Sequence, residues 1–338
     1  MLFGRKGFNR LLPIALLASG LAALMAPASA QEAAPPSQAP AAAGAPETAN
    51  PPAADVLQVE ILYLKQLRDK NPPLSLLDLP PADDGVAGAK LAIADNNTTG
   101  RFTKQNFSLN VVESANVDDL LAAATKQTEA GGAIIAADME SADLLKLADA
   151  MAGKQALILN VGSPDDALRE ENCRANVLHL PPTRSMLADA LAQYLAWKQW
   201  RNWFLIVGPQ PEDKLYADAL KRAAKRFGMK IVEEREFKYE VGSRRSDGGF
   251  EQIQQQIPSF TQNAKEHDVV LVADEGALFG EYIPYRTWSA RPVAGSAGLT
   301  ASSWHPALEL WGGTQFQNRF KRMNNRNMRP LDYDAWVA

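Results

Sequence analysis

Residues 84–97, DGVAGAKLAIADNN, decide the fold class of this chain. Their apolar side chains, Val86 and Leu91 among them, predict a helix with one packing face. Residues 56–64 before this helix and 107–112 after it are short apolar runs that predict strands. A strand, a helix and a second strand in this order favour a parallel sheet that is covered by helices.

The same alternation of strands and helices continues in two series along the chain. In the first series we expect helices at 117–130 and 141–151 and strands at 133–137 and 156–161. In the second series we expect helices at 186–199, 214–227 and 251–267, the last interrupted or ended near Pro258, and strands at 203–207, 230–237, 269–273 and 292–297. Two similar series predict an α/β fold of two Rossmann-like lobes with parallel sheets, joined by a hinge.

The two lobes are expected to share the chain unevenly. Residues 56–183 are predicted to form lobe 1 and residues 184–307 lobe 2, because an extended segment at 178–183 offers a crossing between the two series. Residues 308–338 are expected to return to lobe 1.

The first thirty residues predict export from the cytoplasm. A basic head precedes the apolar run 11–24, and Ala28-Ser29-Ala30 follows it with the small-x-small pattern that signal peptidase cleaves. A membrane anchor is the alternative, but the apolar run is shorter than the roughly 20 residues of a spanning helix. Residues 31–55 are rich in Ala and Pro and predict a disordered leader. The mature chain is therefore expected outside the cytoplasm, without insertion into the membrane.

Composition argues for a binding protein rather than an enzyme. Residues 1–30 hold three basic and no acidic residues, so net charge moves from −4 to −7 after cleavage, which argues against a nucleic-acid partner. The single cysteine excludes an internal disulfide, and the three histidines show no metal-ligand spacing. No G-x-S-x-G elbow, phosphate loop or dinucleotide fingerprint is present. A hydrolytic or redox enzyme on an α/β scaffold stays open as the alternative, and we expect no catalytic cofactor.

Two motifs carry a resemblance to a known family. Residues 85–97 and the run Tyr216-Ala-Asp-Ala-Leu220 resemble elements of type I periplasmic solute-binding proteins, the receptors of ABC importers for branched-chain amino acids. The order and spacing of the elements are similar over residues 56–338. The resemblance implies a ligand held between two lobes that close around it. It also implies further closing elements after residue 338, because the chain stops within a predicted helix at 332–338.

Three details resemble a narrower branch, the binding proteins encoded with alcohol dehydrogenases that depend on pyrroloquinoline quinone (PQQ). They are Tyr63-Leu64 with its Pro-rich loop, the run 267–275, and Pro284-Tyr-Arg-Thr-Trp288 together with Trp304-His305. The branch implies that the ligand is PQQ or a related small polyacid. The implied partners are an ABC permease or a PQQ-dependent dehydrogenase.

Candidate ligand contacts are found where the predicted strands end, since parallel α/β sheets bind ligands at their carboxyl edge. Arg184 and Lys214 would hold carboxylates, and an indole with an imidazole at 304–305 would contact rings. The full predicted set is Asp138, Ser163, Arg184, Lys214, Tyr216, Asp274, Glu275, Trp304 and His305.

Several of these residues have a structural alternative. Trp304 is expected in the core if it does not stack on ligand, Arg184 could pair with a surface acid, and Asp138 could cap the following helix. Amino-acid receptors of the family use small hydroxyl residues where Asp138 and Glu140 stand, and Ser163 keeps a hydroxyl in the neighbouring loop. An amino-acid-type ligand is therefore the alternative to PQQ.

Overall fold

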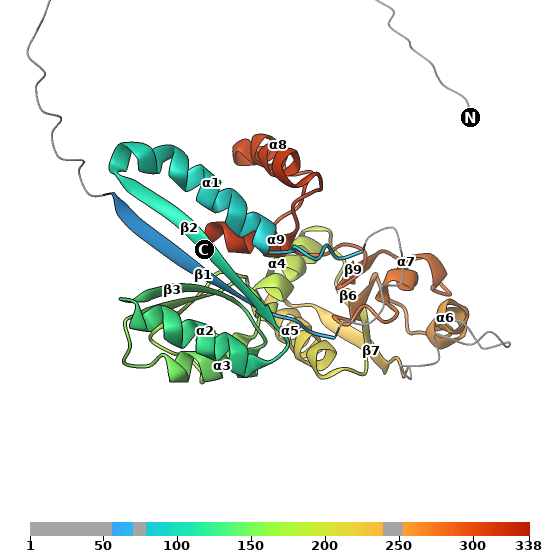
Figure 1. Ribbon diagram of the computed structural model, residues 1–338. Coiled ribbons are helices and arrows are strands. Elements are labelled where there is room, and N and C mark those ends of the chain that lie inside the picture. Colours follow the sequence, from blue (N-terminus) through green and yellow to red (C-terminus); the bar gives the residue numbers. More distant parts are fainter. Residues whose placement is uncertain (1–55, 70–78, 239–252) are drawn as a thin grey trace, which may run out of the picture. The chain divides into compact units, whose positions relative to one another are not determined.

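The computed structural model describes residues 56–69, 79–238 and 253–338 (Figure 1). The predicted export signal and the Ala/Pro-rich leader lie outside these residues. Within the described residues, no helix combines the length and the apolar character that crossing a bilayer requires.

Two separate parallel sheets organise the chain, which confirms the predicted α/β fold. Sheet 1 has the strand order β2-β1-β3-β4-β5 and sheet 2 the order β7-β6-β8-β9. The strands of sheet 1 are β1 (Leu57–Gln66), β2 (Gln105–Ser114), β3 (Ala133–Asp138), β4 (Ala156–Asn160) and β5 (Val177–His179). The strands of sheet 2 are β6 (Asn202–Val207), β7 (Lys230–Glu236), β8 (Val269–Ala273) and β9 (Val293–Gly295).

Helices cover both faces of sheet 1. One face packs against α2 (Val117–Glu129) and α3 (Ser141–Ala150), with Leu64, Ile135 and Leu147 fully buried between the layers. The other face packs against α1 (Val86–Thr103) and α9 (Pro330–Val337), as Figure 1 shows. Burial from both sides explains why the inner strands read as continuous apolar runs.

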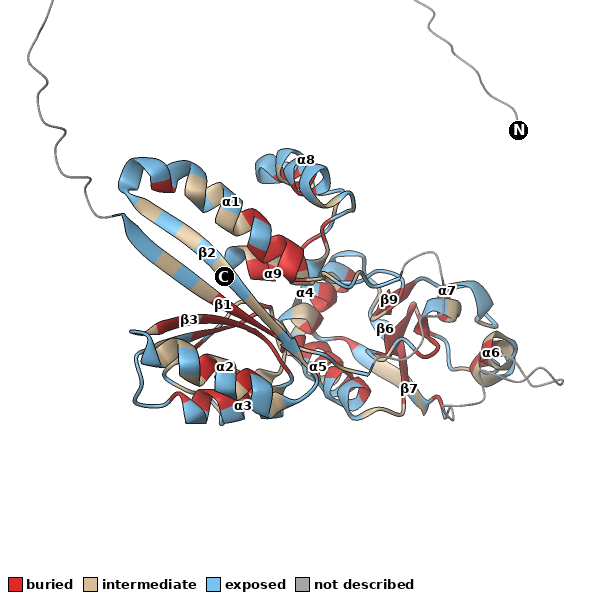
Figure 2. Ribbon diagram, viewed as in Figure 1, coloured by how far each residue is buried: buried red, intermediate tan, exposed pale blue. Residues whose placement is uncertain are grey.

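Sheet 2 has the same layered construction. The helices α4 (Arg184–Trp197) and α5 (Pro211–Phe227) pack on one face, and α6 (Ile253–Thr261) and α7 (Ile283–Arg286) lie on the other. Every residue of β8 is buried, and the buried strands stand out against the exposed outer faces of the helices in Figure 2. A short apolar run of five residues is typical of such a central parallel strand.

The chain ends on α1 rather than on sheet 2. The helix α8 (Gly313–Asn324) contributes the fully buried Phe320 to a cluster with Leu91 of α1, and α9 crosses α1 closely. Gly88 permits this crossing, because a Cβ atom there would lie 1.8 Å from the backbone oxygen of Asp332. Gly85 has φ = 81°, a backbone conformation that favours glycine. Both glycines of the sequence motif 85–97, Gly85 and Gly88, therefore have a structural reason.

Several boundaries differ from the sequence-based expectations. Residues 177–179 form the edge strand β5, although we expected an extended crossing there; they pair in parallel with β4. The helix expected at 186 begins at Arg184, because the Thr183 hydroxyl accepts the N–H of Met186 and caps it. The helix expected at 214 begins at Pro211, a residue suited to the first helical turn. The helix expected at 251–267, with an interruption or an end near Pro258, continues through Pro258 and ends at Thr261.

Candidate ligand-binding site

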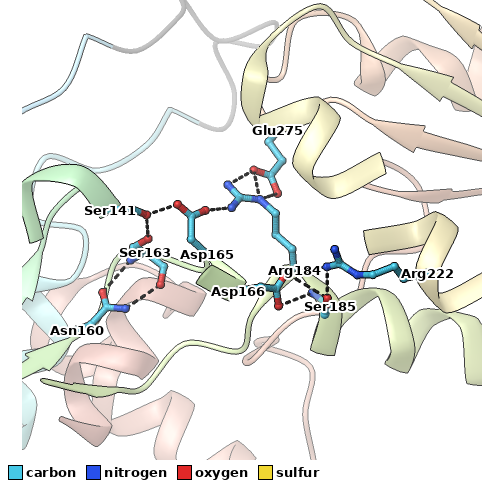
Figure 3. A network of polar contacts seen from close by, with 9 residues as sticks. All are labelled: Ser141, Asn160, Ser163, Asp165, Asp166, Arg184, Ser185, Arg222 and Glu275. Carbon is cyan, nitrogen blue, oxygen red and sulfur yellow. Dashed lines mark hydrogen bonds and ion pairs between the residues drawn. The ribbon is translucent and has the colours of Figure 1, made fainter. Parts of the chain in front are cut away.

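Polar side chains gather at the carboxyl ends of β3, β4 and β8. Ser141 opens α3 just after β3, and Ser163 and Asp165 follow β4. Glu275 follows β8 of the other sheet, and Arg184 is the first residue of α4. Figure 3 shows these side chains pointing toward one another in a single hydrogen-bonded row. The edge that parallel α/β sheets use for ligands therefore carries a connected polar network.

A pair of hydroxyl groups forms the sheet 1 end of this row. The Oγ atoms of Ser141 and Ser163 lie 2.6 Å apart. Asn160, fully buried at the end of β4, fixes the turn that carries Ser163. Its Nδ2 donates to the backbone oxygen of Ser163 at 2.8 Å, and its Oδ1 accepts the N–H of Ser163 at 2.9 Å. The backbone that carries the Ser163 hydroxyl is thus fixed by its hydrogen bonds to Asn160.

Arg184 joins carboxylates that follow strands of the two sheets. Its Nε lies 2.9 Å from Glu275 Oε1 and its Nη2 lies 2.7 Å from Glu275 Oε2. Its Nη1 donates to Asp165, which also accepts a hydrogen bond from the hydroxyl of Ser141. The Arg184 side chain is only 6% exposed, whereas the two carboxylate side chains keep partial contact with water. One buried cation and two acids give the centre of the row a net charge of −1.

A second set of hydrogen bonds, beside the one at Arg184, connects the segment after β4 with α4 and α5. Asp166 Oδ2 accepts from the hydroxyl of Ser185 at 3.1 Å and from Arg222 Nη2 of α5 at 3.1 Å. Neighbouring acids after β4 therefore bond to neighbouring residues at the start of α4, which aligns the helix end that carries Arg184 (Figure 3).

Two buried carboxylates position Glu275 without reaching the network. Asp213 Oδ1 accepts the N–H of Glu275 at 2.7 Å, and its Oδ2 accepts the N–H of Gln210 at 3.0 Å. Burial raises the pKa of Asp213 to about 6. Asp274 accepts three successive backbone N–H groups, those of Leu278, Phe279 and Gly280. Both carboxylates act on the loop backbone, so they act as positioning groups for Glu275.

The structure brings together three of the nine predicted contact residues: Ser163, Arg184 and Glu275. Asp138 lies beside them and accepts from Arg68 Nη2 at 2.9 Å instead of capping a helix. Asp274 accepts backbone N–H groups of the loop that follows it.

The other four predicted residues lie elsewhere. Lys214 is exposed on α5, and Tyr216 is buried in the core of sheet 2, where burial and then the charge of Glu275 raise its pKa. Trp304 is buried and stacks on the ring of Tyr333 with centroids 5.2 Å apart. His305 is exposed, and its Nδ1 accepts the N–H of Ala307 at 3.2 Å. Ligand contacts by all nine residues stay predictions.

Sequence reasoning missed Ser141, Asp165 and the role of Asn160. Ser141 and Asp165 each stand a few residues after a predicted strand, at 133–137 and 156–161 respectively. The signal that marks them is the same as for Ser163: a polar residue directly after a buried parallel strand. Within the described residues, no group of His, Cys, Asp and Glu side chains has a metal-binding arrangement.

Comparison with known proteins identifies the family. Residues 80–277, more than half of the chain, match the family model described as "Periplasmic binding protein", and the chain belongs to that family. No curated protein sequence matches the chain.

Solved structures share the fold at low sequence identity. A branched-chain amino acid ABC transporter periplasmic ligand-binding protein from Burkholderia xenovorans is 17% identical with a TM-score of 0.62, over 82% of this chain and 75% of that one. A leucine-, isoleucine-, valine-, threonine- and alanine-binding protein from Brucella ovis is 16% identical with a TM-score of 0.60, over 82% and 74%. A solute-binding protein from Rhodopseudomonas palustris in complex with 3,4-dihydroxybenzoic acid is 13% identical with a TM-score of 0.58, over 83% and 78%.

Proposed function

We propose that this protein is the periplasmic receptor of an ABC importer and that its ligand is a small zwitterion of the α-amino acid type. One observation carries the proposal: Arg184 lies between Asp165 and Glu275, directly beside the hydroxyl pair of Ser141 and Ser163. Both signs of charge and two neutral hydroxyls therefore occur within one row of side chains.

The hydroxyl end suits a carboxylate. Ser141 and Ser163 can each donate one O–H, and Ser141 opens α3, whose N-terminus favours negative charge. The carboxylate of Asp165 already accepts the hydroxyl of Ser141 in this structure. A ligand carboxylate would take over that bond, and Asp165 would turn toward the ligand's ammonium group.

The acidic end suits an ammonium group. Asp165 and Glu275 are both ion-paired to Arg184, and one guanidinium balances only one of their two charges. An ammonium group between the two acids would neutralise the remaining charge through charge-assisted hydrogen bonds. The Brucella relative is named for binding amino acids, and a relative from Desulfitobacterium hafniense is described in complex with Leu.

The PQQ hypothesis is less well supported by the same geometry. Arg184 is engaged by two carboxylates, Lys214 is exposed on α5, and Trp304 packs among aromatic rings of the core. A polyanion would add negative charge to a site that is already net negative. PQQ, with its delivery to a dehydrogenase, stays the second hypothesis from sequence resemblance alone.

A thermal-shift panel tests the proposal. The chain without residues 1–30 would be scanned with each of the twenty amino acids, with benzoate and with PQQ. A ligand that binds only the folded state at 100 times its Kd adds about 2.7 kcal/mol of stability. We expect at least one amino acid to raise the melting temperature by several degrees and PQQ to leave it unchanged. Stabilisation by PQQ and by no amino acid would reverse the ranking of the two hypotheses.

A matched pair of variants ties the effect to the site. Ser163→Ala removes one hydroxyl of the pair, and we expect about a tenfold loss of affinity for the stabilising amino acid. Ser289→Ala removes an exposed hydroxyl far along the chain and is expected to change nothing.

A further inference from the structure

A second polar pair lies beside the hydroxyl pair on sheet 1. Arg68 follows β1, and its Nη2 lies 2.9 Å from Oδ1 of Asp138, the last residue of β3. The Asp138 side chain is 6% exposed and the Arg68 side chain is 25% exposed. No prediction from the sequence included Arg68.

The pair is adjacent to Ser141 and Ser163 through two short connections. Gly162, which precedes Ser163, lies against Asp138: a Cβ atom on Gly162 would be 2.3 Å from Asp138 Oδ1. Glu140, which precedes Ser141, has its Oε1 3.9 Å from Arg68 Nε. The pair and the hydroxyls therefore occupy one stretch of the same sheet edge.

Arg68 has a donor without an acceptor. Its Nε is buried and has no hydrogen-bond partner among the described residues, because the 3.9 Å separation from Glu140 is too long for a hydrogen bond. Buried polar groups in folded proteins are nearly always hydrogen-bonded, so an orphaned N–H beside a candidate ligand site indicates a partner that the ligand supplies.

The Arg68–Asp138 pair is suited to a neutral polar group on the ligand. Arg68 offers the Nε–H donor, and the carboxylate of Asp138 offers acceptor capacity, while their charges cancel. A primary amide fits both, since its oxygen accepts and its nitrogen donates. A carboxylate would meet the charges of Asp138 and Glu140. An aliphatic group would leave the donor unpaired in a desolvated place.

We propose that Arg68 and Asp138 form a side-chain subsite that selects amino acids with an amide side chain, such as glutamine, over aliphatic ones, such as leucine. The inference rests on the proposed function, because the hydroxyl pair and the acids at Arg184 must hold the α-carboxylate and α-ammonium first. Specificity then follows from the cost of leaving a buried donor unpaired when the wrong side chain binds.

Calorimetric titration with glutamine and leucine tests the subsite. We expect the wild-type protein to bind glutamine about ten times more tightly than leucine. In Arg68→Met the preference is expected to fall to within about threefold, with leucine affinity unchanged or increased. Arg68→Lys keeps the positive charge beside Asp138 but lacks the Nε–H, and we expect it to lose most of the preference while retaining the fold. Arg174→Met, which breaks an exposed ion pair with Asp149, is the matched control and is expected to keep the wild-type preference.

The outcomes separate this inference from the proposed function. Equal binding of glutamine and leucine by the wild type, or an unchanged preference in both Arg68 variants, overturns the subsite and leaves the zwitterion receptor standing. Binding of neither amino acid, nor of any other, overturns the proposed function and the subsite with it.

Discussion

Arg184, at the start of α4, forms a two-point ion pair with Glu275, a residue 91 positions further along the chain. The pair is completed by Asp165, so one guanidinium lies between acids that follow β4 and β8. The stability of the site and its charge both depend on this arrangement.

Replacing Arg184 by Met is expected to lower the free energy of unfolding by about 2–4 kcal/mol, because two neighbouring carboxylates lose their counter-ion while keeping partial hydration. Urea unfolding at neutral pH measures the change. Lys214→Met removes an exposed cation on α5 and is expected to stay within about 0.5 kcal/mol of wild type. Equal stabilities of the two variants would contradict a structural role for the ion pair.

Gly88→Ala is expected to separate α1 from α9. The added Cβ would lie 1.8 Å from a backbone oxygen and 2.5 Å from a backbone carbon of Asp332, and neither atom can move without the helix. We expect a loss of at least about 1–3 kcal/mol, as for overpacked cores. Thr99→Ala, an exposed position on the same helix, serves as the control in the same unfolding experiment. A Gly88→Ala protein as stable as this control would show that α9 does not pack where the structure places it.

Asp334→Asn is expected to stabilise the protein at neutral pH. Burial raises the pKa of Asp334 to about 6, and the hydroxyl of Ser303 only partly opposes this. Because the folded state binds the proton more tightly than the unfolded state, the wild type loses stability as pH rises from about 4 to about 6. The amide removes that loss, so the variant should gain up to about 3 kcal/mol at pH 7 and nothing at pH 4.

The same substitution two residues earlier on α9, Asp332→Asn, is expected to have the opposite effect on stability. The fully buried carboxylate of Asp332 accepts hydrogen bonds from Arg326 and from the backbone N–H groups of Gly85 and Arg329. Asp332→Asn should therefore destabilise the protein at pH 7, by about 3–5 kcal/mol if the buried ion pair is lost. Thermal unfolding of the Asp334→Asn and Asp332→Asn variants across pH 4–8 measures both effects. A more stable Asp332→Asn protein would contradict a stabilising ion pair between Asp332 and Arg326.

Trp304→Ala distinguishes the two hypotheses for the Trp304 side chain, packing in the core and stacking on the ligand. The Trp304 ring contacts those of Tyr333 and Phe316, with centroids 5.2 Å from each. We expect about 3–5 kcal/mol of lost stability, as for other buried aromatic truncations, and unchanged ligand affinity in the folded fraction. A stable variant with weakened affinity would instead support the ligand stacking that the sequence suggested.

Most of the fold could be predicted because buried helices and strands have characteristic patterns of apolar residues in the sequence. The central strands β3, β6 and β8 were found within one residue of their observed ends, since each is a short apolar run between polar loops. The three-residue strand β5 was missed: Val177–His179 is too short to show a period, and its pairing with β4 depends on tertiary contact.

The candidate site could be predicted only in outline. Ser163 and Glu275 were predicted at strand ends and Arg184 just after the crossing segment 178–183, and the structure joins the three in one network. Local sequence cannot tell which polar residue reaches a neighbour and which one holds its own loop, as Asp274 does. The indole of Trp304 was assigned to ligand on residue type, whereas its direction is decided by the packing of α1 and α8 around it.

The central claim is that the site holds both charged ends of a zwitterion. Isothermal titration calorimetry with glutamine and with leucine, each also in its N-acetylated and its carboxamide form, tests it most directly. The N-acetyl form lacks the ammonium group for Asp165 and Glu275, and the carboxamide lacks the carboxylate for Ser141 and Ser163. We expect at least one free amino acid to bind and both blocked forms of it to bind at least about tenfold more weakly. Full affinity of either blocked form would contradict the account.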